Sequence, residues 1–350
     1  MPIRTGYEQI VPHRTSDLFA YSARKNGVVK SVSNEGIVIE YEDGEELGFE
    51  LGRRFGHAAG LIIPHSVITT LRKGDKFKVG DIICYNNGFF EADSLNPKQI
   101  VLKYSLLART ALLENPITLE DSCAISQDLS NRLNAKMTKV RTVVLNFTQN
   151  VHRLVNVGDH VEVQDILCII EDPVGDSSVL LDETSLNTLR NLSAQTPLAK
   201  MRGMVERIEV FYHGDKEDMS ESLRAIVTQS DKELIKRNKA AGKPAFDGSV
   251  DDSFRVDGSP LMLDTLAVKI YITHDMGANT GDKAVFANQL KTVIGEVMEN
   301  EVRSESGVVI DALFGKLSVD NRIVGSVDEM GTTNVLLELL ADRAVKAYNS

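Results

Sequence analysis

The 350-residue chain contains no tryptophan, and aromatic residues make up only 6% of it. A surface that stacks nucleic-acid bases on aromatic rings therefore has little material here. Positive charge is also scarce, because 39 Lys and Arg face 50 Asp and Glu, giving a formal net charge of −11. A protein that binds duplex DNA by itself normally carries an excess of positive charge. Any contact with nucleic acid must come from a few local residues or from partner proteins.

Cysteine is scarce as well, and Cys84, Cys123 and Cys168 are far apart. This odd number predicts neither a disulfide framework nor a zinc site, and it favours a reducing, intracellular environment. No stretch approaches about 18 consecutive apolar residues, and residues 1–9 contain no apolar core of an export signal. We therefore expect a soluble protein with no membrane partner. Its length predicts about two or three domains.

The sequence does contain a repeated β pattern. Alternating apolar residues over 26–49 predict a β meander with turns at 33–35 and 42–44. Residues 71–84 and 155–168 share the frame Gly-Asp-x-h-x-Val-x-Asp-Ile-h-Cys, where h is apolar. Gly tolerates a positive φ and Asp can bond nearby backbone, so each Gly-Asp predicts a tight turn leading into a strand. These repeats are typical of small, curled β barrels.

The second half of the chain mixes strands and helices. The polar segment 215–257 contains a helical stretch from about Met219 to Ala241, which we interpret as an inserted arm facing solvent or a partner. Strands are predicted at 197–210, 265–273 and 307–311. A final helix from about Thr332 to Ala347 has Thr332 or Thr333 as its expected N-cap.

Single motifs of this kind are common, but their order resembles the β, or second-largest, subunit of multisubunit DNA-dependent RNA polymerases. The meander with its Gly-Val-Val start is followed by Arg53 and Arg54, the first Gly-Asp element, Glu120-Asp121 within Leu-Glu-Asp-Ser, and the second Gly-Asp element. A Gly-Asp-Lys motif then places Lys283 eight residues before a second lysine, Lys291, as in the family. The resemblance covers roughly residues 20–350, and it thins beyond Lys291 to 307–315, Arg322 and the last helix.

The chain also departs from the family's pattern. Residues 287–290 replace the Arg-His-Gly that the family has between the two lysines, and no glycine follows Lys291. The large N-terminal lobes and the C-terminal segment that joins the clamp are missing. The chain therefore resembles one piece of a split and divergent β subunit, as large bacteriophages encode, and a viral origin is our expectation.

The resemblance implies a mixed α+β, β-rich fold with small barrels of the double-psi and sandwich types, an inserted helical arm and a C-terminal helix. We expect five regions. They are an N-terminal β meander (1–60), a hybrid-binding-type region with Glu120 and Asp121 (61–150), a sandwich-barrel module resembling the flap or wall (151–214), a helical insertion and linker (215–258), and a hybrid-binding-type region with both lysines and the last helix (259–350).

The resemblance also implies roles for these residues in RNA synthesis, a two-Mg²⁺ reaction. The family's main metal ligands are three Asp residues on the partner β′ subunit, and no Asp-x-Asp-x-Asp run occurs here. Glu120 and Asp121 would lie near the nucleotide-borne Mg²⁺ and contact it through water. Lys283 and Lys291 would neutralise phosphates of the nucleotide or the RNA. Arg53, Arg54 and Arg322 would contact nucleic acid.

The expected function is that of a β-subunit fragment, active only in complex with a β′-like subunit and other β fragments. DNA template, RNA product and nucleoside triphosphates would be its further partners, in the cytoplasm of a host cell or inside a virion. One alternative is a non-catalytic virion or regulatory protein that retains the fold. Another is a biotinyl- or lipoyl-carrier barrel, but Lys200 lies between Ala199 and Met201 and not in the usual carrier setting.

Overall fold

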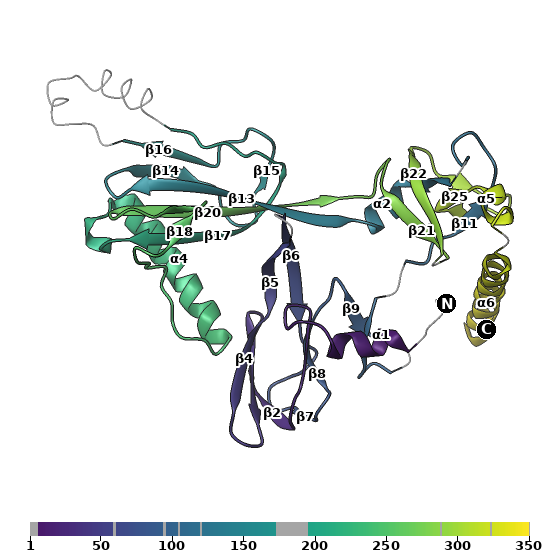
Figure 1. Ribbon diagram of the computed structural model, residues 1–350, viewed down its shortest axis with the longest axis horizontal. Helices are drawn as coiled ribbons and strands as arrows, with labels where there is room; N and C mark the ends of the chain where they lie inside the picture. The colour runs from purple at the N-terminus through teal and green to yellow at the C-terminus, as the bar shows by residue number, and fades with distance from the viewer. Residues whose placement is uncertain are drawn as a thin grey trace. The chain divides into compact units, whose positions relative to one another are not determined.

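The computed structural model describes residues 6–58, 61–93, 96–103, 106–119, 121–172, 195–287, 289–322 and 324–349. Strands predominate over helices in these residues (Figure 1), which confirms a β-rich mixed fold. The chain forms two compact units that interleave along the sequence. Unit 1 comprises 1–5, 104–135 and 276–350, and unit 2 comprises 6–103 and 136–275. The expected region 61–150 therefore contributes to both units.

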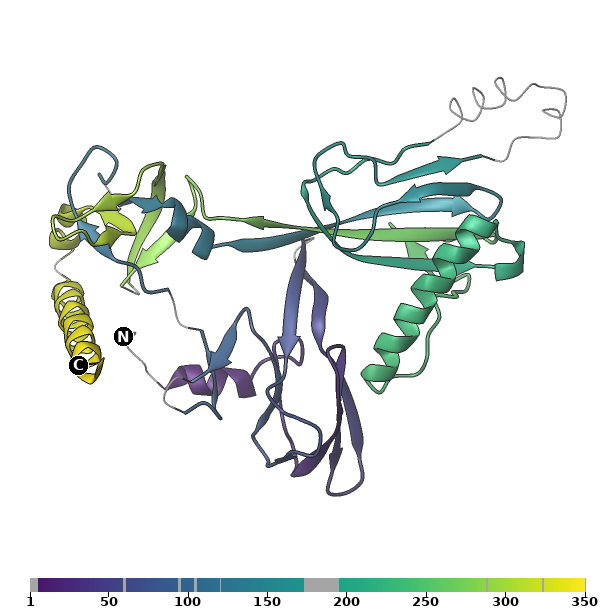
Figure 2. The same cartoon turned by 180° about the vertical axis from the view of Figure 1, so that it is seen from behind.

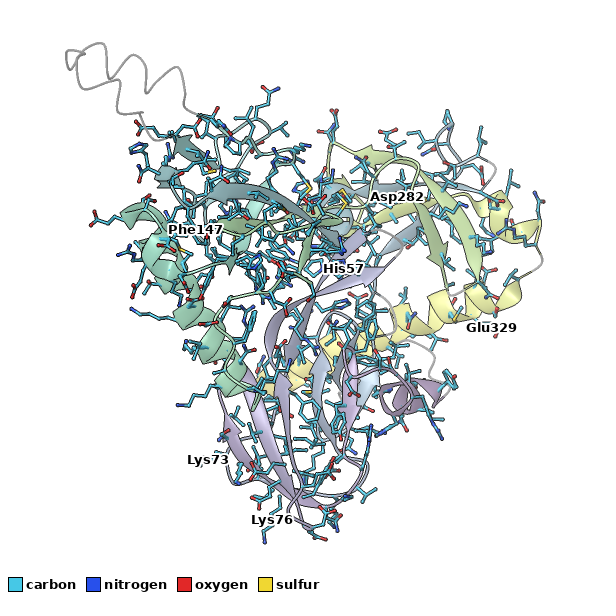
Figure 3. The ribbon with its side chains drawn as sticks, turned by 60° about the vertical axis from the view of Figure 1, so that its left-hand side comes forward. His57, Lys73, Lys76, Phe147, Asp282 and Glu329 are labelled. Carbon is cyan, nitrogen blue, oxygen red and sulfur yellow. The ribbon has the colours of Figure 1, made fainter. Side chains whose placement is uncertain are left out.

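The predicted meander is a four-stranded antiparallel sheet in unit 2, with strand order β4-β3-β2-β7. Its turns lie at 33–35 and 42–44, as expected. Alternate residues of this sheet point into one core, which includes Val29, Ile37 and Ile39. Lys73 and Lys76 lie at its far end (Figure 3). The strands are β2 (Gly27–Val32), β3 (Gly36–Tyr41), β4 (Glu46–Glu50) and β7 (Lys76–Phe77).

A larger sheet forms the rest of the unit 2 framework, with order β1-β8-β6-β13-β20-β17-β15 and β5 paired to β6. Its long strands β17 and β20 run antiparallel side by side (Figures 1 and 2). The strands are β1 (Ala20–Ser22), β5 (Gly52–Ala58), β6 (Leu61–Ile68), β8 (Ile82–Asn86), β13 (Ala135–Asn146), β15 (His160–Val161), β17 (Gly203–His213) and β20 (Thr265–Met276).

Short elements complete unit 2 as strand pairs and single turns of helix. The pairs are β9 (Phe90–Ala92) with β10 (Ile100–Leu102), β14 (Asn150–Leu154) with β16 (Cys168–Glu171), and β18 (Arg255–Val256) with β19 (Ser259–Pro260). The helical turns are α1 (Tyr7–Ile10), η1 (Val11–His13) and η3 (Lys216–Asp218). Closure of these sheets into barrels stays a prediction.

Five turns in the described residues share one hydrogen-bond scheme. In each, an Asp side-chain Oδ2 accepts the N–H of the residue three positions earlier at 2.7 or 2.8 Å. The Asp N–H returns a bond to that residue's carbonyl, and the residue before Asp has a positive φ. This is the backbone of a type II turn. The aspartates are Asp75, Asp81, Asp159, Asp165 and Asp282.

Each turn also docks on a buried residue of the same unit through two reciprocal backbone bonds. The turn residue with positive φ donates its N–H to the carbonyl of the buried residue, whose own N–H donates to the Asp carbonyl. All ten distances are 2.8 or 2.9 Å. The buried residues are Val29, Ala23, Val205, Ala199 and Ile294. The predicted Gly-Asp turns are thus confirmed, and Gly281-Asp282 forms the same turn.

Helix α4 (Glu221–Ala240) confirms the predicted helix, but it is not an arm facing solvent or a partner. Ser220 caps it by accepting the Leu223 N–H. The buried residues of α4 face β14 and β17, and its end packs against β3 and β4. A Cβ on Gly48 would lie 1.8 Å from the Ala241 carbonyl oxygen. Because only hydrogens at Gly36 and Gly48 allow this approach, the helix joins both parts of unit 2.

Unit 1 contains a five-stranded sheet with order β11-β25-β12-β22-β21. The final helix begins at Gly325, seven residues before Thr332, so the expected caps at Thr332 and Thr333 are wrong. Asp328 in its first turn favours this earlier start. The predicted strand at 307–311 is only β24. The elements are β11 (Thr110–Leu112), β12 (Ser122–Ser126), α2 (Gln127–Arg132), β21 (Lys283–Phe286), β22 (Leu290–Met298), β23 (Val302–Arg303), β24 (Val309–Ile310), β25 (Ala312–Phe314), α5 (Lys316–Asp320) and α6 (Gly325–Asn349).

The three cysteines are free and buried in three different hydrophobic cores. Burial raises the pKa of the Cys84 thiol to about 12 and that of Cys168 to about 11. None of the helices in the described ranges is long and apolar enough to cross a membrane.

Gly48→Val tests the docking of α4. Added methyl groups would overlap the Ala241 backbone, and we expect the free energy of unfolding of unit 2 to fall by about 1–3 kcal/mol. Amide hydrogen exchange at the end of α4 should rise in the same variant. Gly331→Ala in α6 is the control, because a Cβ there meets nothing within 4 Å. Equal protection of α4 in Gly48→Val and the unmodified protein would contradict this docking.

His65 makes unit 2 sensitive to acid. Its ring is buried, and its Nδ1 lies 2.7 Å from the Asn86 amide nitrogen, which donates to the neutral ring. Burial, helped by Arg54 and Arg53, lowers the pKa of His65. Below pH about 6.5 the unfolded chain therefore binds a proton that the folded chain resists, so stability falls as pH falls. Denaturant unfolding of His65→Gln between pH 7 and 5 should show a weaker loss than the unmodified protein.

Candidate functional site

The predicted lysines lie together on the β21–β22 hairpin of unit 1. Lys283 is opposite Val293 and Lys291 is opposite Val285, so all four side chains share one face of this antiparallel pair. That face is exposed at all four positions. Diagonal neighbours of this kind have Cα atoms roughly 7–8 Å apart. Two cations therefore stand side by side on one surface.

The opposite face of the hairpin anchors it in the core. Phe286, Leu290 and Ile294 belong to the hydrophobic core of unit 1, and Phe286 stacks on Phe314 with ring centroids 5.0 Å apart. Lys283 directly follows Asp282, whose turn docks on Ile294. The docked turn fixes where β21 begins, and because side chains alternate along a strand, it also fixes which face Lys283 occupies.

Asp121 joins the same corner through its backbone. Its φ is +65°, a left-handed conformation that Asp tolerates better than most residues but that still needs support. Its carbonyl accepts the Thr292 hydroxyl at 2.5 Å and the Val293 N–H at 3.0 Å. Thr292 is buried and follows Lys291 directly. Asp121 is thereby bonded to the strand that carries Lys291.

The Asp121 side chain pairs with Arg322, from the segment after α5. Arg322 Nη2 lies 2.6 Å from Asp121 Oδ2, with the side chains 36% and 50% exposed. The Arg322 N–H donates to the Val319 carbonyl, and the Ser318 hydroxyl accepts the Asp121 N–H at a long 3.4 Å. We call Asp121, Arg322, Lys283 and Lys291 the acid–base corner. Figure 3 labels Asp282, whose turn precedes Lys283.

The corner has one described carboxylate, because Glu120 lies outside the described residues. Within the described ranges, no group of three or more His, Cys, Asp and Glu side chains could hold a metal ion. A single carboxylate paired with an arginine fits a water-bridged contact to a hydrated Mg²⁺ better than direct coordination.

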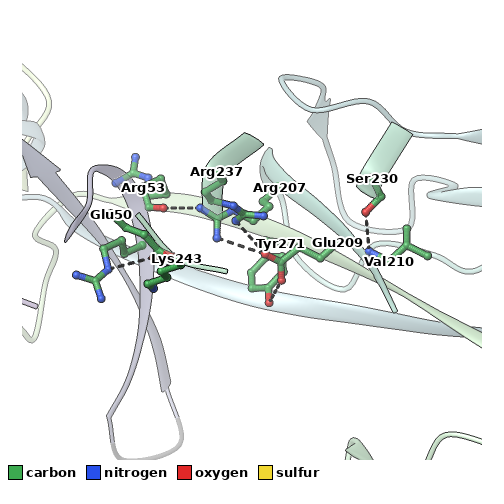
Figure 4. Close-up of polar contacts among 10 residues, drawn as sticks. Glu50, Arg53, Arg207, Glu209, Val210, Ser230, Arg237, Lys243 and Tyr271 are labelled. Carbon is green, nitrogen blue, oxygen red and sulfur yellow. Dashed lines mark hydrogen bonds and ion pairs between the residues drawn. The ribbon is translucent and has the colours of Figure 1, made fainter. Parts of the chain in front are cut away.

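Arg53 and Arg54 lie in unit 2, in a polar network shown in Figure 4. Arg53 Nη2 lies 2.8 Å from Glu206 Oε1, and the Arg53 carbonyl accepts a bond from Arg207. Arg54 lies 3.7 Å from Glu50. These pairs hold both arginines within unit 2, and their contact with nucleic acid stays a prediction.

Arg207 and Arg237 share one carboxylate, Glu209, which also accepts the Tyr271 hydroxyl (Figure 4). Burial and the neighbouring Arg237 lower the pKa of Arg207. Burial and Glu209 raise the pKa of Tyr271, so it stays protonated and donates to Glu209. This network links β17, β20 and α4, and the sequence pattern did not indicate it.

Thr292 and Ser318 are site residues that the sequence analysis missed. Thr292 sits at a buried position of an alternating strand, where a β-branched residue is expected for packing. Its only signal was a polar side chain at a core-facing position next to Lys291. Ser318 carried no such signal.

The comparison with known proteins agrees with the resemblance noted above. The chain is 20% identical over 297 residues to the DNA-directed RNA polymerase subunit beta of Paenarthrobacter aurescens (strain TC1), covering 77% of this chain and 25% of that protein. The same protein of Arthrobacter sp. (strain FB24) matches with the same values. The chain thus spans about a quarter of the length of these curated relatives. No protein-family model matches it. These similarities support a distant relationship to the polymerase β subunit.

Thr292→Val tests how Asp121 is held. The variant keeps the shape of the side chain but removes the hydroxyl that donates to the Asp121 carbonyl. We expect unit 1 to lose about 0.5–1.5 kcal/mol of stability in denaturant unfolding, with faster hydrogen exchange around residues 121–123. Thr292→Ser keeps the hydroxyl and should preserve the slow exchange. Equal exchange in both variants would rule out this role for the hydroxyl.

Proposed function

We propose that this chain is a β-type fragment of a DNA-dependent RNA polymerase and acts in template-directed RNA synthesis. One observation carries the proposal: the structure brings Lys283, Lys291 and Asp121, which are predicted from separate motifs, to one exposed corner of one sheet. The distant relationship to the polymerase β subunit points to the same activity.

The acid–base corner fits the charges of this reaction. The two lysines would neutralise phosphates of the incoming nucleotide or of the RNA near its 3′ end. Lysine suits this work because its ammonium group is a mobile point charge with three donors. Asp121, with Glu120, would hold water on a nucleotide-borne Mg²⁺. When bound, Mg²⁺ ions would activate the RNA 3′ hydroxyl and stabilise the pyrophosphate that leaves.

The proposal requires partners, because a two-metal reaction needs several carboxylate ligands. A β′-like subunit with three metal-binding aspartates would supply them, and other β fragments would complete the assembly around DNA, RNA and nucleotides. We propose that the chain comes from a split polymerase of a large bacteriophage, active in the host cytoplasm or packaged in the virion. Arg53, Arg54 and Arg322 would add contacts to nucleic acid.

A non-catalytic virion or regulatory protein with the same fold is the second candidate. The replaced segment between the lysines favours it: the hairpin turns there within three residues, with Ala287 at a φ of +49°. The experiment below separates the two functions.

Lys283→Ala/Lys291→Ala is the decisive variant. The tagged chain is purified with its partners from its native source, and template-dependent RNA synthesis is measured. Loss of both cations should lower the rate by at least about 100-fold, as with removal of a charge-stabilising group. Retained activity in this variant, or absence of a β′-like partner, would favour the assembly protein.

Lys73→Ala/Lys76→Ala is the matched control. It removes the same charge, and Lys76 follows the Gly74-Asp75 turn just as Lys283 follows Gly281-Asp282. We expect its activity to stay within about twofold of the unmodified complex. An equal loss in both double variants would indicate a general effect of charge and contradict the assigned site.

A further inference from the structure

The Asp121–Arg322 ion pair is built to change partners. Both side chains are well exposed, and exposed ion pairs contribute little stability because water solvates and screens each charge. A ligand with better partners for both groups can therefore open this pair at small cost.

The backbone around the pair is held independently of it. Thr292 and Val293 bind the Asp121 carbonyl, and Val319 accepts the Arg322 N–H. The two side chains can thus separate by rotation alone, while the strand and the end of α5 stay in place. The sheet geometry is kept while the pair opens.

The neighbouring charges indicate which ligand would open it. The Asp121 carbonyl is bonded to Thr292 and Val293, which follow Lys291 and lie opposite Lys283. An anion held by these lysines would arrive beside the pair. A free triphosphate could attract Arg322 but would repel Asp121. A triphosphate that carries a divalent cation offers an anion to Arg322 and a hydrated cation to Asp121.

We propose that a metal-bound nucleoside triphosphate opens the Asp121–Arg322 pair, and that the closed pair selects against metal-free nucleotide. This inference rests on the proposed function and specifies how the same corner distinguishes its substrate. Arg322 passes from the carboxylate to a phosphate, and Asp121 passes from the guanidinium to a metal-bound water. No covalent bond changes.

A double-mutant cycle in binding tests the exchange without turnover. The unmodified complex, Asp121→Asn, Arg322→Gln and the double variant are titrated with an α,β-methylene nucleoside triphosphate matched to the template, by equilibrium dialysis with Mg²⁺ or with EDTA. Each single variant loses a ligand contact but is spared the opening of the pair. With Mg²⁺ the double variant should therefore lose about two- to fivefold more affinity than the product of the single losses.

With EDTA the sign should change for one variant. Asp121→Asn should bind the metal-free nucleotide about two- to fivefold more tightly than the unmodified complex, because Arg322 is then free. Arg322→Lys keeps the charge and should lose less affinity than Arg322→Gln. Lys316→Gln/Asp320→Asn removes another exposed pair, within α5, and should change neither titration.

Two results would overturn the inference. A double variant no weaker than the weaker single variant would mean that the pair stays closed with ligand bound. Unchanged or weaker metal-free binding by Asp121→Asn would remove the selection. Both differ from failure of the proposed function, in which the unmodified complex itself neither synthesises RNA nor binds the nucleotide.

Discussion

The reciprocal bonding between each Asp turn and one buried residue is the constraint on which this structure depends. Two backbone hydrogen bonds fix the turn to the core, and the Asp side chain closes the turn upon itself. Each bond contributes only about 0.5–1.5 kcal/mol, but an unpaired buried N–H or carbonyl would be costly. The scheme satisfies both groups of the buried residue at once. A sheet built from very short strands can therefore start each strand at a defined residue.

The functional corner uses this constraint at its most exposed point. The turn ending at Asp282 docks on Ile294, so a shift of the hairpin by one residue would separate that docking and turn both lysines into the core. Asp121 is held from the other side of the same strand by Thr292 and Val293. The charged groups gather from segments about 160 residues apart because one central strand, β22, binds both neighbours.

The sequence predicts the parts of the fold that depend on local chemistry. Gly-Asp pairs announce their turns because Gly permits the positive φ and Asp caps the turn, and alternation revealed the strands of the meander. Gln164 takes the place of Gly in one turn, which spacing could still detect. The start of α6 was missed because the threonines inside it resemble caps.

Features set by distant contacts were beyond the reach of the pattern. The docking of α4 depends on two glycines about 200 residues before its end, and neither marks a turn in its own strand. The lysines were predicted from their motif, but their shared face needed the register of β21 and β22. The partner of Asp121 depended on where the segment after α5 lies, which no local spacing encodes.

The division of unit 1 along the chain has a consequence for synthesis of the protein. Strand β12 is made about 170 residues before its neighbours β22 and β25. During translation its apolar residues must wait, while the intervening segment, most of which belongs to unit 2, is produced. The acid–base corner is therefore completed only after α5 has emerged from the ribosome. A chain stopped before that point would present unpaired strand edges in place of a site, and it would be a natural substrate for chaperones.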